Sequence, residues 1–163
     1  IAISPSGIWR LQSGSWQPLS LPLDMTNGWS AGLHYLFDLW DYVGPLDVAS
    51  QGNKLWVAVK GSGKGIYYSA NNGQSWTRVR ADNYVRTVEI DPTTSEVYMG
   101  SSSALSQGGF QADSNGVYVS PNGVNSWVAR NQGLAYKFAS FISISSSGVR
   151  WLVSSGQGVM KWY

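Results

Sequence analysis

The sequence of 163 residues contains no cysteine, so disulfide bridges, thiolate-bound metals and a cysteine nucleophile are excluded. Charged residues make up only 12% of the chain, about half of the usual share, and the net charge is +2. The basic residues are scattered, whereas nucleic-acid binding needs a concentrated basic stripe, so we expect no nucleic-acid partner. No apolar run approaches the ~20 residues of a membrane span. His34 is the only histidine, which leaves a zinc site or a histidine-activated nucleophile with little support, and we expect no metal or cofactor.

Aromatic residues and glycines are abundant instead, with nine Trp, nine Tyr and 19 Gly. This composition is typical of short strands joined by glycine turns, with rings available for packing or for a binding face. Four segments repeat one pattern about 40 to 60 residues apart, a glycine followed by alternating aliphatic and aromatic residues. They are GIWR at 7–10, GIYY at 65–68, GVYV at 116–119 and GVMK at 158–161. The repetition predicts that one small sheet is the unit of the fold.

Other β-branched and aromatic runs lie in a fixed order around these glycines. Each unit therefore has four strands, A, B, C and D in chain order, and the strand that begins at the repeat glycine is strand C. No stretch has a convincing helical period, so we predict an all-β fold of β-propeller blades, each of four antiparallel strands. The expected three to four blades cover about 1–22 without its first strand, 44–81, 84–130, and 138–163 without its last strand. Because incomplete blades would leave bare sheet edges, we expect the C-terminal portion of a longer propeller or one part of a multi-chain propeller.

Two segments at the predicted C–D turns share a second pattern. SANNGQSW at 69–76 and SPNGVNSW at 120–127 resemble the Asp-box, Ser-x-Asp-x-Gly-x-Thr-Trp, also called the BNR repeat. Asn replaces Asp in both copies, and Val124 stands where the second copy should have glycine. The resemblance implies an Asp-box propeller, most similar to secreted xyloglucanase-like and sialidase-like propellers.

The box residues are expected to stabilise the fold and not to form a site. A short polar side chain can hydrogen-bond the backbone amides of its own turn, and glycine permits a positive φ. The tryptophan is expected to pack between sheets while its indole N–H finds a partner. The residues given this structural role are Ser69, Asn71, Gly73, Trp76, Ser120, Asn122 and Trp127.

In propellers of this kind, the ligand face is formed by the D–A and B–C loops, and the boxes lie on the opposite face. The first D–A loop, at about 20–45, is long enough to indicate a function, and it mixes aromatic rings with carboxylates. Rings stack on the apolar face of a sugar, and carboxylates accept hydrogen bonds from its hydroxyl groups. The candidate ligand-binding residues lie in this loop and in two other loops of the same face. They are Trp29, His34, Tyr35, Trp40 and Tyr42 in the first D–A loop, Tyr84 in the second D–A loop, and Phe110 and Gln111 in a B–C loop. Alternatively, the aromatic residues of 33–42 pack on the neighbouring blade.

The resemblance favours extracellular glycan binding or hydrolysis. A glycosidase needs two carboxylates, for which Asp38, Asp41 and Asp113 are the candidates. A sialidase needs a glutamate, paired with a tyrosine, at its active site. It is disfavoured because Glu89 lies within a predicted strand, and Glu96 lies at an A–B turn on the face opposite to the ligand. The expected partner is a poly- or oligosaccharide, together with further blades of the same protein or of other chains. The alternative is a non-catalytic structural or protein-interaction propeller. The expected location is secreted or on the cell surface of a prokaryote, although no signal peptide is visible.

Overall fold

The computed structural model describes residues 1–4, 7–22, 44–61, 63–102, 105–106, 109–110, 115–154 and 157–162. Every regular element within these residues is a β-strand, and all strand pairs are antiparallel. The prediction of an all-β chain is confirmed.

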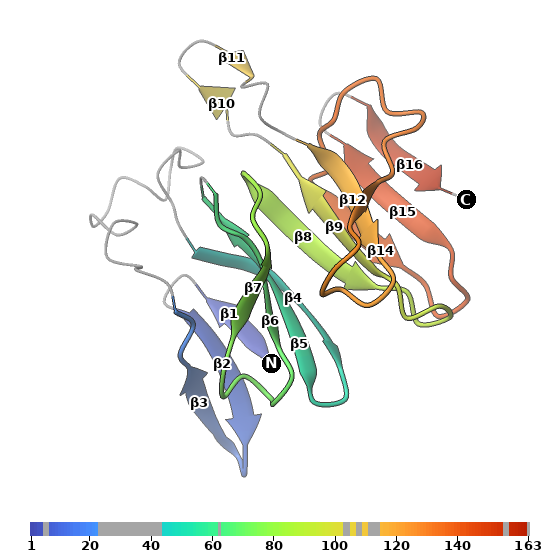
Figure 1. Ribbon diagram of the computed structural model, residues 1–163. Coiled ribbons are helices and arrows are strands. Elements are labelled where there is room, and N and C mark those ends of the chain that lie inside the picture. Colours follow the sequence, from blue (N-terminus) through green and yellow to red (C-terminus); the bar gives the residue numbers. More distant parts are fainter. Residues whose placement is uncertain are drawn as a thin grey trace.

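The middle of the chain forms two four-stranded sheets. The second sheet has the order β4-β5-β6-β7 and comprises β4 (Gly44–Gln51), β5 (Lys54–Lys60), β6 (Gly65–Ser69) and β7 (Thr77–Arg80). The third sheet has the order β8-β9-β12-β13 and comprises β8 (Val85–Ile90), β9 (Val97–Ser101), β12 (Gly116–Ser120) and β13 (Val128–Ala129). Each strand pairs with the next strand of its sheet along the chain, so both sheets are simple meanders. A small hairpin, β10 (Leu105–Ser106) and β11 (Gly109–Phe110), extends from the connection between β9 and β12 (Figure 1).

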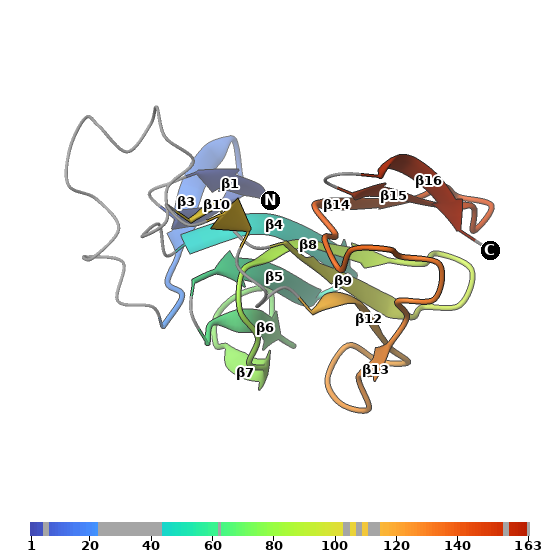
Figure 2. The ribbon, with the colours of Figure 1, turned by 90° about the horizontal axis from the view of Figure 1, so that it is seen from above.

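The two ends of the chain form three-stranded sheets within the described residues. The first sheet comprises β1 (Ala2–Ser4), β2 (Gly7–Gln12) and β3 (Ser15–Leu19). The fourth sheet comprises β14 (Phe141–Ile144), β15 (Arg150–Ser154) and β16 (Gly158–Trp162). Figures 1 and 2 show the four sheets side by side along an arc in chain order, with the first and fourth sheets at its two ends.

The strands nearest the inside of the arc are joined by side-chain hydrogen bonds. β4 contacts β8, and β8 contacts β14. Asp47 Oδ2 on β4 accepts hydrogen bonds from Thr87 Oγ1 at 2.8 Å and from the Val88 backbone N–H at 3.0 Å. Thr87 Oγ1 in turn accepts the Ile142 backbone N–H at 3.3 Å. One carboxylate and one hydroxyl therefore connect three successive sheets.

Two of the four repeat glycines, Gly65 and Gly116, have a steric reason at the start of the third strand of their sheets, whereas a Cβ on Gly7 or Gly158 would meet nothing within 4 Å. Gly65 has φ +89°, and a Cβ there would lie 2.0 Å from the Arg80 carbonyl oxygen. Gly116 has φ +77°, and a Cβ there would lie 2.2 Å from Asn131 Oδ1. That Asn131 oxygen accepts the Val117 N–H at 2.8 Å. Both positions therefore require a residue without a side chain.

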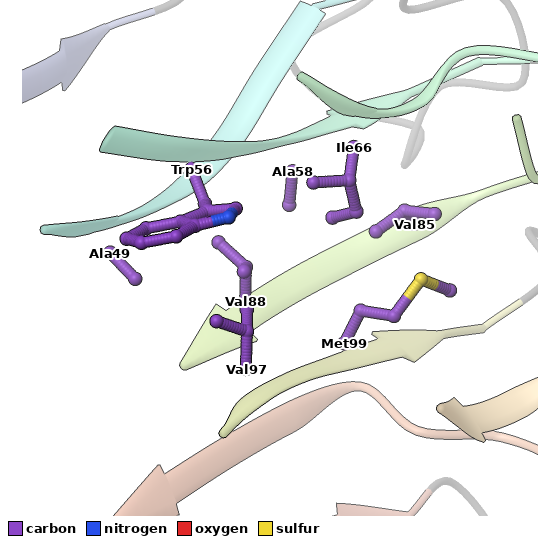
Figure 3. Packing of buried hydrophobic residues seen from close by; sticks show 8 residues of the cluster. All are labelled: Ala49, Trp56, Ala58, Ile66, Val85, Val88, Val97 and Met99. Carbon is purple, nitrogen blue, oxygen red and sulfur yellow. The ribbon is translucent and has the colours of Figure 1, made fainter. Parts of the chain in front are cut away.

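Among the residues that the structure describes, the core consists of three apolar clusters, one between each pair of neighbouring sheets. The cluster between the second and third sheets is drawn in Figure 3 and comprises Ala49, Trp56, Ala58, Ile66, Val85, Val88, Val97 and Met99. A second cluster joins the first sheet to the second through Ile8, Val57, Val59 and Tyr67. A third joins the third sheet to the fourth through Tyr98, Val117, Val119, Ala139, Ile142, Ile144 and Leu152. Because strand residues alternate between faces, each middle sheet contributes one face to each of two clusters.

Candidate functional site

Most residues predicted to bind a ligand lie outside the described residues. These are Trp29, His34, Tyr35, Trp40, Tyr42, Gln111 and the three carboxylate candidates Asp38, Asp41 and Asp113. Phe110 is the last residue of β11, where the structure describes the strand alone. Tyr84 is the one ligand-binding candidate whose surroundings are described.

Tyr84 lies in the loop between the second and third sheets and adopts φ +54°. This left-handed conformation is uncommon for a residue other than glycine, and its backbone is held in place by a neighbouring chain segment. The Tyr84 carbonyl accepts the Ser102 N–H at 3.1 Å. The carbonyl oxygen of Ser101, the residue before Ser102, accepts the Ala139 N–H at 2.9 Å. The end of β9 therefore joins two successive D–A loops.

The Tyr84 loop is further anchored by a buried carboxylate. Asp82 accepts two hydrogen bonds from Arg80, the shorter at 2.8 Å, and one from Asn115 Nδ2 at 2.5 Å. The Arg80 guanidinium also lies over the Tyr118 ring at 3.7 Å from its centroid. Beside Asp82, Asn83 Oδ1 accepts the Gly63 N–H at 2.7 Å. Because both oxygens of Asp82 are occupied by the protein itself, this carboxylate stabilises the loops.

Tyr136 is the most exposed aromatic side chain described at this end of the sheets, with 57% of its surface accessible. Its ring is stacked on that of Phe138, with the centroids 6.1 Å apart and the planes 11° from parallel. Gln157, in the β15–β16 turn, accepts the backbone N–H groups of Ala135 at 3.1 Å and Tyr136 at 3.3 Å through Oε1. These two hydrogen bonds join the D–A loop that carries the exposed Tyr136 ring to the B–C turn between β15 and β16. The sequence argument did not include Gln157 or Phe138, and no local pattern pointed to them.

The opposite end of the sheets carries the two box hairpins, and each is closed by one serine. Ser69 Oγ accepts the backbone N–H groups of Gly73 at 2.8 Å and Asn71 at 3.3 Å, and it donates to Asn71 Oδ1 at 2.9 Å. Asn71 Oδ1 also accepts the Ser75 N–H at 2.9 Å. These bonds satisfy the backbone within the hairpin itself.

The second hairpin repeats this arrangement with one change. Ser120 Oγ accepts the Gly123 N–H at 2.9 Å, and Asn122 Oδ1 accepts the Val124 N–H at 2.9 Å. The glycine therefore stands one position earlier than in the first hairpin, which explains why Val124 is tolerated. Gly123 has φ +70°, and a Cβ there would lie 2.2 Å from Trp56 Nε1 of the second sheet.

The tryptophans of the two hairpins correct one expectation. Trp76 and Trp127 are partly buried and pack against the clusters between sheets. Their Nε1 atoms are buried, however, and neither has a hydrogen-bond partner among the described residues. The expectation that each indole N–H finds a partner was wrong, because in both cases the ring is held by apolar packing.

The remaining described acidic groups lie away from the loop end. Asp91 Oδ2 accepts a hydrogen bond from Arg150 Nη2 at 2.5 Å, and Asp91 Oδ1 accepts the Thr93 N–H and hydroxyl. Burial works to raise the pKa of Asp91, but the hydrogen bonds from Thr93 and Arg150 outweigh it and hold that pKa below its ordinary value. Burial raises the pKa of Glu89, and the Asp47 carboxylate raises it further.

Other site types receive no support from the described part of the chain. No three His, Cys, Asp or Glu residues described there are close enough to hold a metal ion. An open hollow of about 480 Å³ beside the β2–β3 turn is lined by Gln12, Ser13, Ser15 and Gln17, none of which titrates. No helix capable of crossing a membrane occurs among the residues that the structure describes.

Comparisons with known proteins identify the fold. No family model and no curated protein matches the sequence. Among solved structures, YCF48 bound to a D1 peptide is similar at 17% identity and a TM-score of 0.54, over 92% of this chain and 40% of that one. The extracellular domain of a putative hybrid two-component system, BT4673 from B. thetaiotaomicron, is similar at 13% identity and a TM-score of 0.61. That match covers 95% of this chain and 18% of the other.

These similar structures are β-propellers, and they define the class of fold. The four consecutive antiparallel sheets are propeller blades, and the predicted fold class is confirmed. The chain spans less than half the length of the proteins that it resembles. At these levels of identity the likeness concerns the fold alone.

Proposed function

We propose that this chain is part of an extracellular propeller that binds a glycan on the face formed by its D–A and B–C loops. The observation that carries the proposal is Tyr136, an exposed ring supported by Phe138 and fixed by Gln157. A rigid aromatic face is suited to stack on a pyranose ring, since it loses little conformational freedom on binding. Tyr84 lies in the preceding D–A loop, and the end of β9 joins the two loops.

The finer parts of the proposal rest on the resemblance to Asp-box propellers. The hydrogen bonds of Ser69 and Ser120 support the box assignment, because each serine closes its own hairpin. Trp29, Trp40 and Tyr42 are proposed to extend the aromatic face. If the protein hydrolyses its glycan, the acids come from Asp38, Asp41 and Asp113, since the described Asp82 is occupied by Arg80 and Asn115.

A second candidate function is binding of an extended peptide. One observation favours it, namely that the similar YCF48 structure is bound to a D1 peptide. The exposed Tyr136 ring, in a chain with few charges, also suits a protein interface. The secreted or cell-surface location remains part of the proposal, supported by the extracellular domain among the similar structures.

Isothermal titration with soluble plant, bacterial and host glycans, alongside a peptide library, tests both candidates. We expect a glycan to bind, and Tyr136→Ala to weaken binding about tenfold, the equivalent of roughly 1.4 kcal/mol of stacking. Val124→Ala, an exposed substitution on the opposite end, is the matched control and should leave affinity unchanged. Binding of peptides without any glycan would favour the second candidate. Glycan binding with unchanged affinity in Tyr136→Ala would refute the assignment of the binding face.

A further inference from the structure

Each box hairpin contains an asparagine followed directly by a glycine, and this pair of residues is chemically reactive. The glycine amide nitrogen attacks the asparagine side-chain carbon Cγ, and the side-chain nitrogen takes up the amide proton and leaves as ammonia. Water then opens the cyclic imide to aspartate or isoaspartate. Glycine favours the attack because it has no Cβ to obstruct the approach. The two pairs are Asn72 with Gly73, and Asn122 with Gly123.

In both hairpins the attacking nitrogen is held by the box serine. The Gly73 N–H donates to Ser69 Oγ at 2.8 Å, and the Gly123 N–H donates to Ser120 Oγ at 2.9 Å. Both serines are buried. An amide whose hydrogen is bonded to a fixed acceptor must give up that bond before its nitrogen can attack. The reaction is therefore held back in the closed hairpin and requires the hairpin to open locally.

The two asparagine side chains differ, although both are exposed. Asn122 occupies the Asp position of its box, and its Oδ1 accepts the backbone N–H groups of Val124 at 2.9 Å and Asn125 at 3.1 Å. Its Nδ2 donates to Asn125 Oδ1 at 3.1 Å. Asn72 follows the Asp position of the first box, and its side chain makes no hydrogen bond with any residue that the structure describes. The reactive carbon is therefore fixed in the second hairpin and free to turn in the first.

The backbone of Asn72 lies at the contact between the first and second sheets. Its carbonyl oxygen accepts a hydrogen bond from Arg10 Nη1 of β2 at 3.0 Å, and its N–H donates to the Asn53 carbonyl oxygen at 2.8 Å. Isoaspartate routes the main chain through the side-chain carbon, which lengthens the backbone before Gly73. Conversion at this position would therefore displace the carbonyl group that Arg10 holds.

We propose that Asn72 is a latent deamidation site that the Ser69 hydroxyl keeps closed, and that Asn122 is its protected equivalent. Local opening of the first hairpin releases the Gly73 nitrogen beside a side chain that is already free. In the second hairpin, the hydrogen bonds of the Asn122 side chain must break as well. Deamidation at Asn72 accumulates as the protein ages and weakens the contact between the first and second sheets.

Peptide mapping by mass spectrometry tests this, because aspartate and isoaspartate are heavier than asparagine. The chain is incubated at mildly alkaline pH, either folded or unfolded in guanidinium chloride, and the rate is measured at each position. We expect similar rates at Asn72 and Asn122 in the unfolded chain. In the folded chain both should be slower, and Asn72 should react faster than Asn122. Equal folded rates at the two positions, or a folded rate at Asn72 that matches the unfolded one, would overturn the proposal.

Two variants test the role of the serine separately. Ser69→Ala removes the acceptor of the Gly73 N–H, and we expect deamidation at Asn72 about tenfold faster than in the wild type, because the hairpin opens more often. Ser120→Ala is the matched control, since it removes the same bond from the other hairpin and should leave the Asn72 rate unchanged. Circular dichroism establishes that both variants are folded. An unchanged Asn72 rate in Ser69→Ala, or equal acceleration in Ser120→Ala, would show that Ser69 does not control this site.

Discussion

Replacing Ser69 with alanine removes one oxygen atom and tests how much the box hairpin contributes to stability. The side chain is 1% exposed, and its loss leaves the buried Gly73 N–H without the acceptor it has at 2.8 Å. An unsatisfied buried donor costs about 1–3 kcal/mol, and we expect Ser69→Ala to lower the free energy of unfolding by about 2 kcal/mol. For a chain of this length, this corresponds to a fall in melting temperature of about 4–8 °C. The hairpin has little room to adjust, since a Cβ on Gly73 would lie 2.7 Å from Leu19 Cδ1.

Urea unfolding followed by tryptophan fluorescence measures this change. Ser120→Ala should give a loss of similar size, because Ser120 Oγ accepts the equivalent Gly123 N–H. Ser75→Ala is the matched control, since this serine is exposed and its backbone N–H still donates to Asn71. The control should stay within about 0.5 kcal/mol of the wild type. Equal stabilities for Ser69→Ala and Ser75→Ala would refute the view that the buried serine closes the hairpin.

Three further predictions concern backbone space and pH. Gly65→Ala should cost at least about 2 kcal/mol in thermal unfolding, because the new Cβ would meet the Arg80 carbonyl at a positive φ. The lowered pKa of Asp91 means that its stabilising contribution is present above its unfolded pKa of about 3.8 and is lost as the pH falls through the lower folded value. Asp91→Asn should therefore be less stable at pH 7 and lose part of the acid dependence seen in urea titrations. Glu89 has a raised pKa, so its charged form opposes folding as the pH rises, and Glu89→Gln should be more stable at pH 7 by roughly a few tenths of a kcal/mol, with no difference below about pH 4.

The sequence carried enough information for the fold because the fold repeats its local constraints. The glycines at 65 and 116 recur because each starts the third strand of its sheet at a positive φ where a Cβ would meet another segment, the Arg80 carbonyl oxygen or the Asn131 side chain. Ser69 and Ser120 recur because each bonds to amides within its own hairpin, so the pattern is contained in eight residues. Constraints that are local and repeated are visible without knowledge of tertiary structure.

The loop face was less predictable because its contacts join residues that are distant in sequence and occur once. Asp82 meets Asn115 across 33 residues, and Gln157 meets Tyr136 across 21. No pattern of residue spacing in the sequence predicts such pairs. The surroundings of the Trp76 and Trp127 indole N–H groups could not be predicted from the sequence either. Apolar packing against the clusters between sheets, and not hydrogen bonding, holds these two rings.

The two ends of the sheets therefore respond differently to substitution. At the box end, Ser69 and Ser120 satisfy backbone groups inside the fold, so a change there alters the population of folded protein and leaves the loop face of each folded molecule intact. At the loop end, Tyr136 presents its ring to solvent, so we expect its removal to cost little packing and to act on binding of the proposed glycan. Ser69→Ala should lower stability without changing glycan affinity, and Tyr136→Ala should do the reverse. If both variants lost stability and affinity together, the loop face would depend on the box hairpins, and the division of roles between the two ends would fail.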